Sequence, residues 1–177
     1  MSEKLLKPLK GGNHVFFNGH MEELLPYMNE IITHFVSKPE EGSPRVLILC
    51  LNDEHVRRVS ESLTGIVKAN DLTVDLITEK GNKLKQRNDL FDGTEIIVGT
   101  VKRSTELYFQ NGFNMGKIKF VAILDADQMM RNSLKGNLIR LAESLPKCRF
   151  LISALQTEDE RLVDFQKQFC HPYLFIE

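Results

Sequence analysis

Short apolar segments alternate with longer amphipathic segments along most of the chain. Val46 to Leu51 is apolar without interruption, as expected of a strand that helices cover on both faces. Alternating strands and helices predict a mainly parallel sheet with right-handed crossovers, so the expected fold class is α/β, a three-layer sandwich. The apolar segments, rich in β-branched residues, predict strands over residues 14–17, 46–51, 72–77, 95–100, 120–124, 149–152 and 173–176.

The segments between these strands have helical spacing. Apolar side chains recur every three to four positions over residues 21–35, and Pro26 within this pattern predicts a kink or a restart. Asn52 or Asp53 is expected to cap the helix after the strand at 46–51. A capping box is expected to open the last helix at Thr157.

Composition and charge narrow the class of protein. The chain is 42% hydrophobic and 27% charged, which is typical of a folded domain. Its 23 Lys and Arg nearly balance 24 Asp and Glu, which excludes a globally basic nucleic-acid coat but allows a local basic patch. No apolar run approaches the ~20 residues of a membrane span, and no secretory signal is evident. Three cysteines without paired spacing predict neither a disulfide framework nor a zinc site, so an intracellular location, cytoplasmic or nuclear, is expected.

The carboxyl ends of the predicted strands, where ligands of open α/β sheets usually bind, carry a series of polar segments. In chain order they read Leu51-Asn52-Asp53-Glu54, Thr100-Val101-Lys102-Arg103, Leu124-Asp125-Ala126-Asp127 and Ser153-Ala154-Leu155. This series resembles the N-terminal RecA-like domain of DEAD-box RNA helicases, where the matching segments read Pro-Thr-Arg-Glu, Thr-Pro-Gly-Arg, Asp-Glu-Ala-Asp and Ser-Ala-Thr. The resemblance implies a RecA-like fold, related to the P-loop NTPases, for residues 12–177, with residues 1–11 as an N-terminal extension.

The departures from the family pattern concern the nucleotide site. The family places a phosphate-binding loop after the first strand, but here no Gly-Lys-Thr or Gly-Lys-Ser occurs. Leu124 stands where the family has the Asp that holds magnesium, and a leucine offers no oxygen to a hard cation. We therefore expect no catalytic residue, no metal and no cofactor. The degenerate nucleotide-site positions are Asp125, Asp127 and Ser153.

Structural roles are the alternative for these residues. Asp125 and Asp127 are expected to cap the helix that Gln128 begins rather than to take part in catalysis. A one-residue gap would align Asp125 with the first Asp of the family motif, but it would spoil the match on either side. Ser153 is expected to be a buried, hydrogen-bonded hydroxyl, and Cys50 to be part of the core.

The resemblance also implies an RNA-binding track. In the family, the Pro-Thr-Arg-Glu, Gly-Gly and Thr-Pro-Gly-Arg segments hold the backbone of single-stranded RNA. The matching RNA-binding candidates here are Lys80, Gly81, Thr100, Lys102 and Arg103. Lysines and arginines between residues 80 and 87 add positive charge, although such a run is equally typical of a solvated helix face. Asp53 stands where the family has an Arg, which predicts weak binding without sequence preference.

Two functions follow from this pattern. The first is a catalytically inactive helicase-like domain, a pseudoenzyme that serves as a scaffold for single-stranded RNA, for protein partners or for both. The second is one half of an ATP-dependent RNA helicase. That enzyme would use ATP and magnesium, and its missing parts, including a second RecA-like domain, would lie in a longer chain or a partner. Loss of the phosphate-loop lysine together with a metal-holding carboxylate favours the first function.

Overall fold

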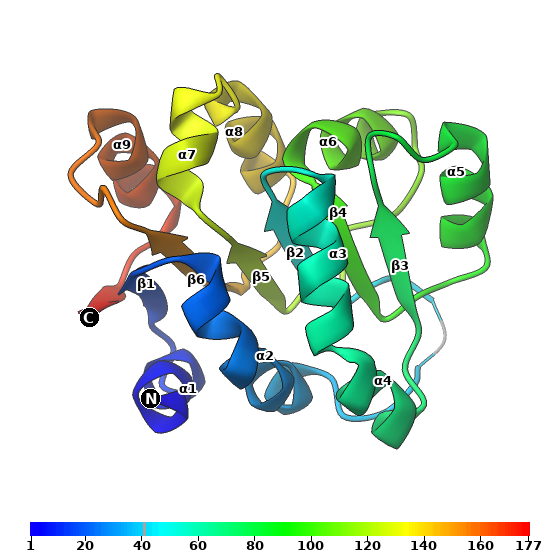
Figure 1. Cartoon of the computed structure of the whole chain (residues 1–177), viewed down its shortest axis with the longest axis horizontal. Coiled ribbons are helices and arrows are strands. Elements are labelled where there is room, and N and C mark those ends of the chain that lie inside the picture. The colour runs from blue at the N-terminus through cyan, green and yellow to red at the C-terminus, as the bar shows by residue number, and fades with distance from the viewer. Residues whose placement is uncertain (41) are drawn as a thin grey trace.

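The computed structural model describes residues 1–40 and 42–177, which form a seven-stranded sheet between two layers of helices (Figure 1). The strands are β1 (His14–Asn18), β2 (Val46–Cys50), β3 (Val74–Ile77), β4 (Ile96–Thr100), β5 (Phe120–Ile123), β6 (Arg149–Ala154) and β7 (Tyr173–Ile176). The helices are α1 (Ser2–Lys10), α2 (Met21–Phe35), α3 (Asp53–Ser62), α4 (Thr64–Asn70), α5 (Lys83–Phe91), α6 (Val101–Phe109), α7 (Ala126–Arg131), α8 (Lys135–Glu143) and α9 (Glu160–Phe169).

All the strands run parallel, in the order β3-β4-β2-β5-β6-β1-β7. At the centre of the sheet, Ile48 of β2 lies opposite Val98 of β4 and Ala122 of β5. Successive strand residues point to opposite faces, so an uninterrupted apolar strand contributes to both faces of the sheet. The predicted α/β three-layer sandwich is therefore confirmed.

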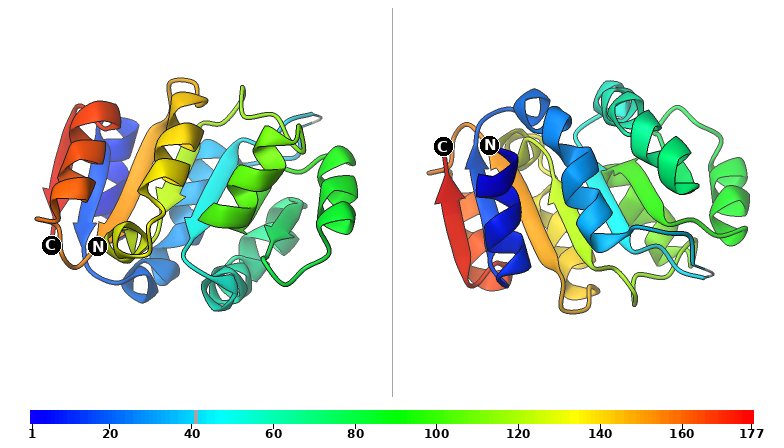
Figure 2. Two further views of the ribbon diagram at one scale, coloured as in Figure 1. Left: turned by 90° about the horizontal axis from the view of Figure 1, so that it is seen from above. Right: turned by 90° about the horizontal axis from the view of Figure 1, so that it is seen from below.

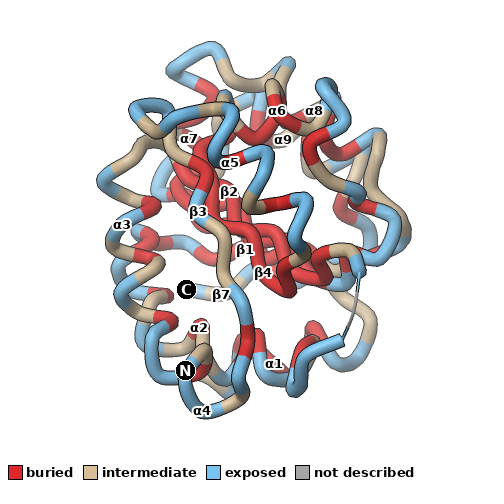
Figure 3. Tube along the Cα trace, turned by 90° about the vertical axis from the view of Figure 1, so that its right-hand side faces the viewer, coloured by how far each residue is buried: buried red, intermediate tan, exposed pale blue. Residues whose placement is uncertain are grey.

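The two faces of the sheet carry separate hydrophobic cores. Ile48 and Phe120 belong to the core beneath α1 to α4, whereas Leu49 and Val121 belong to the core on the side of α6 to α9 (Figure 2). Figure 3 shows the central strands as a buried slab between exposed helix surfaces, whereas β3 is partly buried and β7 is largely exposed. Because both faces of the central strands are buried, their polar side chains gather at the strand ends, where the loops are.

Three local features differ from the sequence pattern. Residues 2–10 form helix α1, which the pattern did not predict, and its Leu5 and Leu9 are buried in the first of these cores. Helix α2 continues through Pro26 without a restart; Pro26 is exposed, so water can reach the carbonyl that proline leaves unbonded. The last helix is capped by the carboxylate of Asp159, not by Thr157. The domain boundary at residue 12 stays a prediction.

Substitution of Ile48 by Ala should lower the free energy of unfolding by about 2–5 kcal/mol, because it leaves a cavity at a fully buried position in the central strand. Phe91→Ala is the control: this side chain is 89% exposed, and its removal should change stability by no more than about 0.5 kcal/mol. Urea denaturation measures both values. Equal losses in the two variants would contradict this assignment of the core.

Candidate functional site

The carboxyl ends of the parallel strands meet at one edge of the sheet, and the segments singled out in the sequence lie there. Strand β1 ends at Asn18 and helix α2 begins at Met21, so only Gly19 and His20 connect them. A Cβ atom on Gly19 would lie 2.4 Å from the Phe17 ring, so any side chain there would collide with its surroundings. The connection between β1 and α2 is therefore short and tightly packed.

The carboxylate of Asp125 lies against the N-terminus of α2. Its Oδ1 accepts the Met21 N–H at 2.8 Å, although the two residues are 104 positions apart. The Asp125 N–H in turn donates to Oγ of Ser153 at 2.8 Å, and that hydroxyl lies 3.4 Å from Oδ1 of Asp125. All three residues are buried. A negative side chain of the protein itself thus occupies the position where a helix N-terminus favours an anion.

This environment perturbs the Asp125 carboxyl. Burial raises its pKa above the usual range because the charged form loses hydration. The hydrogen bond from Met21 and the nearby His55 and His20 act in the opposite direction, and Asp127 adds to the increase. The net increase means that the ionised carboxylate destabilises the folded chain relative to a neutral group of the same shape.

Asp127 is engaged in a different contact. Its Oδ2 accepts the Gln156 N–H at 3.0 Å and lies 3.8 Å from the guanidinium of Arg131. Helix α7 begins at Ala126 without a side-chain cap, so the expectation that Asp125 and Asp127 cap this helix is wrong. Both carboxylates instead connect separate segments of the strand-end edge. The expected burial and hydrogen bonding of Ser153 are confirmed.

The loop at residues 79–81, which the resemblance places beside RNA, is held from two sides. The carboxylate of Asp53 accepts the Glu79 N–H at 2.7 Å and the Lys80 N–H at 3.0 Å. The guanidinium of Arg103 donates to the Glu79 carbonyl at 2.6 Å and to the Gly81 carbonyl at 3.0 Å. Two side chains thus engage both the donors and the acceptors of this loop.

Two more of the candidates are structural in this arrangement. Thr100 is fully buried and caps α6, since its Oγ1 accepts the Arg103 N–H at 3.2 Å. A side chain at Gly81 would displace Gln86, because a Cβ atom there would lie 2.2 Å from the side-chain nitrogen Nε2 of Gln86. Lys80 and Lys102 remain exposed. Of the five RNA-binding candidates, these two lysines therefore offer accessible side-chain charge.

Most of the other lysines and arginines at this edge form ion pairs with carboxylates. Lys83 pairs with Glu106 at 3.0 Å, and Lys85 pairs with Asp89 at 2.7 Å. Arg57 and Arg58 pair with nearby glutamates, as the contacts Arg57–Glu54, Arg57–Glu61 and Arg58–Glu22 show. Within the described ranges, Lys80, Arg87 and Lys102 have no carboxylate within ion-pair distance. The basic track is thus shorter than the sequence suggests.

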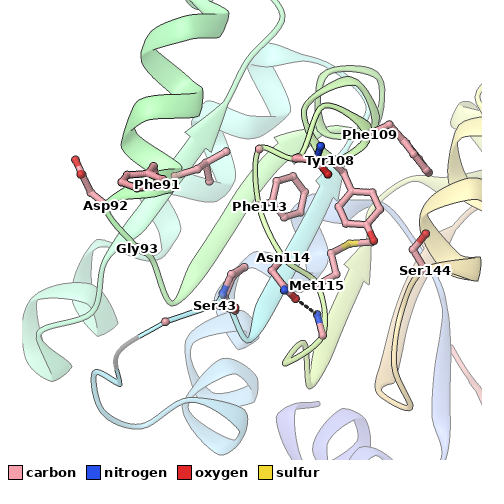
Figure 4. Close-up of a pocket in the computed structure, with 16 residues that line it drawn as sticks. Ser43, Phe91, Asp92, Gly93, Tyr108, Phe109, Phe113, Asn114, Met115 and Ser144 are labelled. Carbon is pink, nitrogen blue, oxygen red and sulfur yellow. Dashed lines mark hydrogen bonds between the residues drawn. The ribbon is translucent and has the colours of Figure 1, made fainter.

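A cavity of about 850 Å³ that sequence reasoning missed lies at the opposite edge of the sheet (Figure 4). It is bordered by residues that precede β2 and β4, such as Ser43 and Gly93. An aromatic group forms another border, in which the ring centroids of Tyr108 and Phe113 are 5.5 Å apart. The exposed ring of Phe91 lies at its rim. In the sequence, the apolar residues that line this cavity cannot be distinguished from apolar residues of the core. The cavity does not coincide with the strand-end segments.

The described residues contain neither a candidate membrane span nor a metal-binding cluster. No helix among them combines the length and apolarity that a membrane crossing requires. Across residues 1–40 and 42–177, His, Cys, Asp and Glu side chains form no group of three or more suited to holding a metal ion.

The arrangement defines an α/β domain of the RecA-like class. Residues 24–161 match the sequence model of the DEAD/DEAH box helicase family. This chain belongs to the DEAD/DEAH box helicase family.

Relatives and solved structures agree with this family. The ATP-dependent RNA helicase RhlB of Vibrio campbellii is 27% identical over 110 residues, which cover 59% of this chain and 25% of that protein. The probable ATP-dependent RNA helicase ddx3 of Dictyostelium discoideum is 21% identical over 145 residues, which cover 78% of this chain and 20% of that protein. The chain thus spans about a quarter or less of these curated relatives.

Solved structures show the same fold at low sequence identity. A DEAD box protein from Methanococcus jannaschii superposes with a TM-score of 0.88 at 16% identity, over 99% of this chain and 48% of that chain. A hypothetical ATP-dependent RNA helicase from Sulfolobus tokodaii superposes with a TM-score of 0.86 at 16% identity, over 99% of this chain and 51% of that chain. These likenesses establish the seven-stranded parallel architecture as that of DEAD-box domains.

Asp125→Asn should preserve or raise the stability of the fold, because an amide oxygen can still accept the Met21 N–H and Asn tolerates the left-handed backbone at this position (φ 59°). Asp125→Ala should lose roughly 2–4 kcal/mol, through an unpaired buried N–H and left-handed strain. Denaturation of both variants at neutral pH measures these differences.

The pH dependence of the same variants separates charge from packing. A raised pKa means that the folded state holds the proton more tightly, so the contribution of Asp125 to stability falls as the pH rises above its unfolded value of about 3.9. The advantage of Asp125→Asn should therefore grow from pH 4 toward pH 7. A stability difference independent of pH would argue against the buried-carboxylate interpretation.

Proposed function

We propose that this domain is a non-hydrolysing member of its family that acts as a scaffold, binding single-stranded RNA weakly, protein partners, or both. The observation that carries the proposal is the Asp125 carboxylate on the Met21 N–H at the start of α2. In the family, the phosphate-binding loop occupies the junction between the first strand and this helix. A nucleotide phosphate arriving here would meet a buried carboxylate already hydrogen-bonded to the helix.

Charge around the junction adds to this argument. Glu22 and Glu23 lie in the first turn of α2, and Oε2 of Glu23 accepts the His20 N–H at 2.8 Å. Together with Asp125 they place three acidic side chains at the helix end where the family binds a polyanion, and of these Glu22 is paired with Arg58. Like charges repel at short range, and the repulsion is strongest at the buried Asp125, where water is excluded.

The positions that hold magnesium in the family are also poorly suited to a cation here. Leu124 is fully buried and provides no oxygen ligand, and the carboxylates of Asp125 and Asp127 already accept backbone N–H groups. A divalent cation would have to break these contacts before it could be held. The geometry thus supports the absence of ATP and magnesium as working cofactors.

The alternative function is one half of an ATP-dependent RNA helicase. It is favoured by the names of the curated relatives, of which this chain spans about a quarter or less. A longer chain or a partner could contribute a second RecA-like domain. It could not rebuild the β1–α2 junction, which lies inside this domain, and for this reason we favour the scaffold.

RNA contact, in this proposal, depends on exposed Lys80 and Lys102 beside the 79–81 loop. The loop amides of Glu79 and Lys80 are already bonded to Asp53, so a phosphate would have to displace a carboxylate to reach them. Two accessible lysines can neutralise few phosphates, which predicts low affinity, strong salt dependence and no base readout.

The chain should neither bind nor hydrolyse ATP in a magnesium-dependent manner, with or without single-stranded RNA. Calorimetry with ATP at saturating magnesium and at excess chelator measures binding, and phosphate release measures turnover. RNA-stimulated hydrolysis by the purified chain would establish the helicase alternative instead.

Labelled single-stranded RNA should bind at low salt with an anisotropy change that is lost near physiological salt. Lys80→Gln/Lys102→Gln should weaken binding and reduce the salt slope by about 2, one for each lost phosphate contact. Lys117→Gln/Lys119→Gln removes the same charge from exposed positions at the opposite edge and should leave binding unchanged. Absence of RNA binding at any salt would leave a protein scaffold; equal losses in both double variants would locate RNA elsewhere.

A further inference from the structure

A cavity of about 590 Å³ lies at the amino ends of β1, β6 and β7, at the edge of the sheet opposite Asp125. Its wall includes the segment before β1, the turn between α8 and β6, and the segment between α9 and β7. The views in Figure 2 place these elements beside one another at one end of the domain. None of the helicase segments discussed above reaches this cavity.

Basic and imidazole side chains converge on the cavity from these three segments. They are His14, Lys147, Arg149 and His171, and none of the residues lining the cavity is acidic. Lys147 and Arg149 have no carboxylate within ion-pair distance in the part of the chain that the structure describes. The Arg149 guanidinium donates to the Cys148 carbonyl at 3.4 Å. Among the described residues, the positive charge here therefore has no carboxylate partner.

His14 is set up as a hydrogen-bond donor. Its Nδ1 accepts the Phe150 N–H at 3.0 Å, so the neutral ring carries its proton on Nε2. Burial, followed by the charges of Arg149 and His171, lowers the pKa of His14 to about 4. The ring is therefore neutral at pH 7, mainly because burial disfavours its charged form, and the neighbouring Arg149 and His171 add to the effect.

The carboxyl ends of α1, α8 and α9 also face this edge, and each carries a partial charge of about −0.5. These partial charges offset roughly one and a half of the two full charges on Lys147 and Arg149, so a small excess of positive charge remains. Gly12 leaves room for the guanidinium: its φ is 95°, and a Cβ atom there would lie 3.3 Å from Nη2 of Arg149.

We infer that this cavity binds a small phosphate-bearing molecule of about nucleotide size. An arginine fork beside a lysine and two imidazoles suits a phosphate group, which accepts several charge-assisted hydrogen bonds at once. The volume falls within the usual range for small-molecule sites. Leu145, Pro146 and Phe169 form an apolar wall against which the non-phosphate part can pack.

Calorimetric titration of the full chain with AMP and with pyrophosphate, at excess chelator, tests this inference, with adenosine as the uncharged control. AMP or pyrophosphate should bind saturably and adenosine should not. Arg149→Gln should weaken binding at least tenfold, as expected for the loss of a charge-assisted hydrogen bond. Lys147→Gln, on an exposed side chain outside the strand, should weaken it several-fold and carries the test if Arg149→Gln does not fold.

Lys68→Gln on exposed α4 removes the same charge far from the cavity and should leave binding unchanged. Absence of binding by both phosphate probes, or an equal loss in Lys68→Gln, would overturn the inference. Displacement of AMP by single-stranded RNA, itself lost in Arg149→Gln, would assign the cavity to RNA rather than to a small ligand. Magnesium-dependent ATP binding that survives Arg149→Gln would instead contradict the proposed function, so the two failures are distinguishable.

Discussion

The hydrogen bond from the Met21 N–H to the Asp125 carboxylate fixes how three segments meet at the strand-end edge. Met21 begins α2, Asp125 follows β5, and the Ser153 hydroxyl that receives the Asp125 N–H belongs to β6. A carboxylate buried among backbone groups is costly unless it is paired, and the helix N-terminus provides that pairing. The short β1–α2 connection and the left-handed backbone at Asp125 both favour this contact, because together they bring the helix and the carboxylate within hydrogen-bond distance.

A carboxylate also accepts backbone N–H groups near β3, at the far side of the sheet. Asp53 accepts two N–H groups of the 79–81 loop, and Arg103 donates to two of its carbonyls. Charge-assisted contacts of this kind are stronger than neutral ones, so the loop has a defined shape before any partner arrives. At both places a carboxylate of the protein engages backbone donors that would otherwise be open to a phosphate.

Much of the fold could be predicted from sequence because buried parallel strands are continuously apolar. The apolar run ending at Leu51 gave a strand, and Asn52 gave the cap of the helix after it. Helix α1 was missed because it is only nine residues long and contains Pro8, which usually interrupts a helix, although Leu5 and Leu9 lie one turn apart and pack into the core. Where strands are apolar on both faces, sequence shows their order along the chain but not which neighbours they pair with.

The roles of the site residues could not be predicted in the same way. The partner of Asp125 lies 104 positions away, and the partners of Asp53 lie 26 and 27 positions away. Which backbone group a carboxylate reaches depends on strand order and loop length, which no local pattern encodes. Arg103 shows the consequence: its position matches a family motif, yet its guanidinium is directed to loop carbonyls rather than to solvent.

The tight junction at Gly19 has an evolutionary consequence. A Cβ atom at Gly19 would collide with the Phe17 ring, and the Met21 N–H two positions on is bonded to Asp125, so a longer connection would have to displace that carboxylate. Substitution of Asp125 by a residue without an acceptor leaves the buried Met21 N–H unpaired, which is costly, whereas Asn keeps the contact. The junction therefore limits the residues that a lineage can accept at position 125 without a loss of stability.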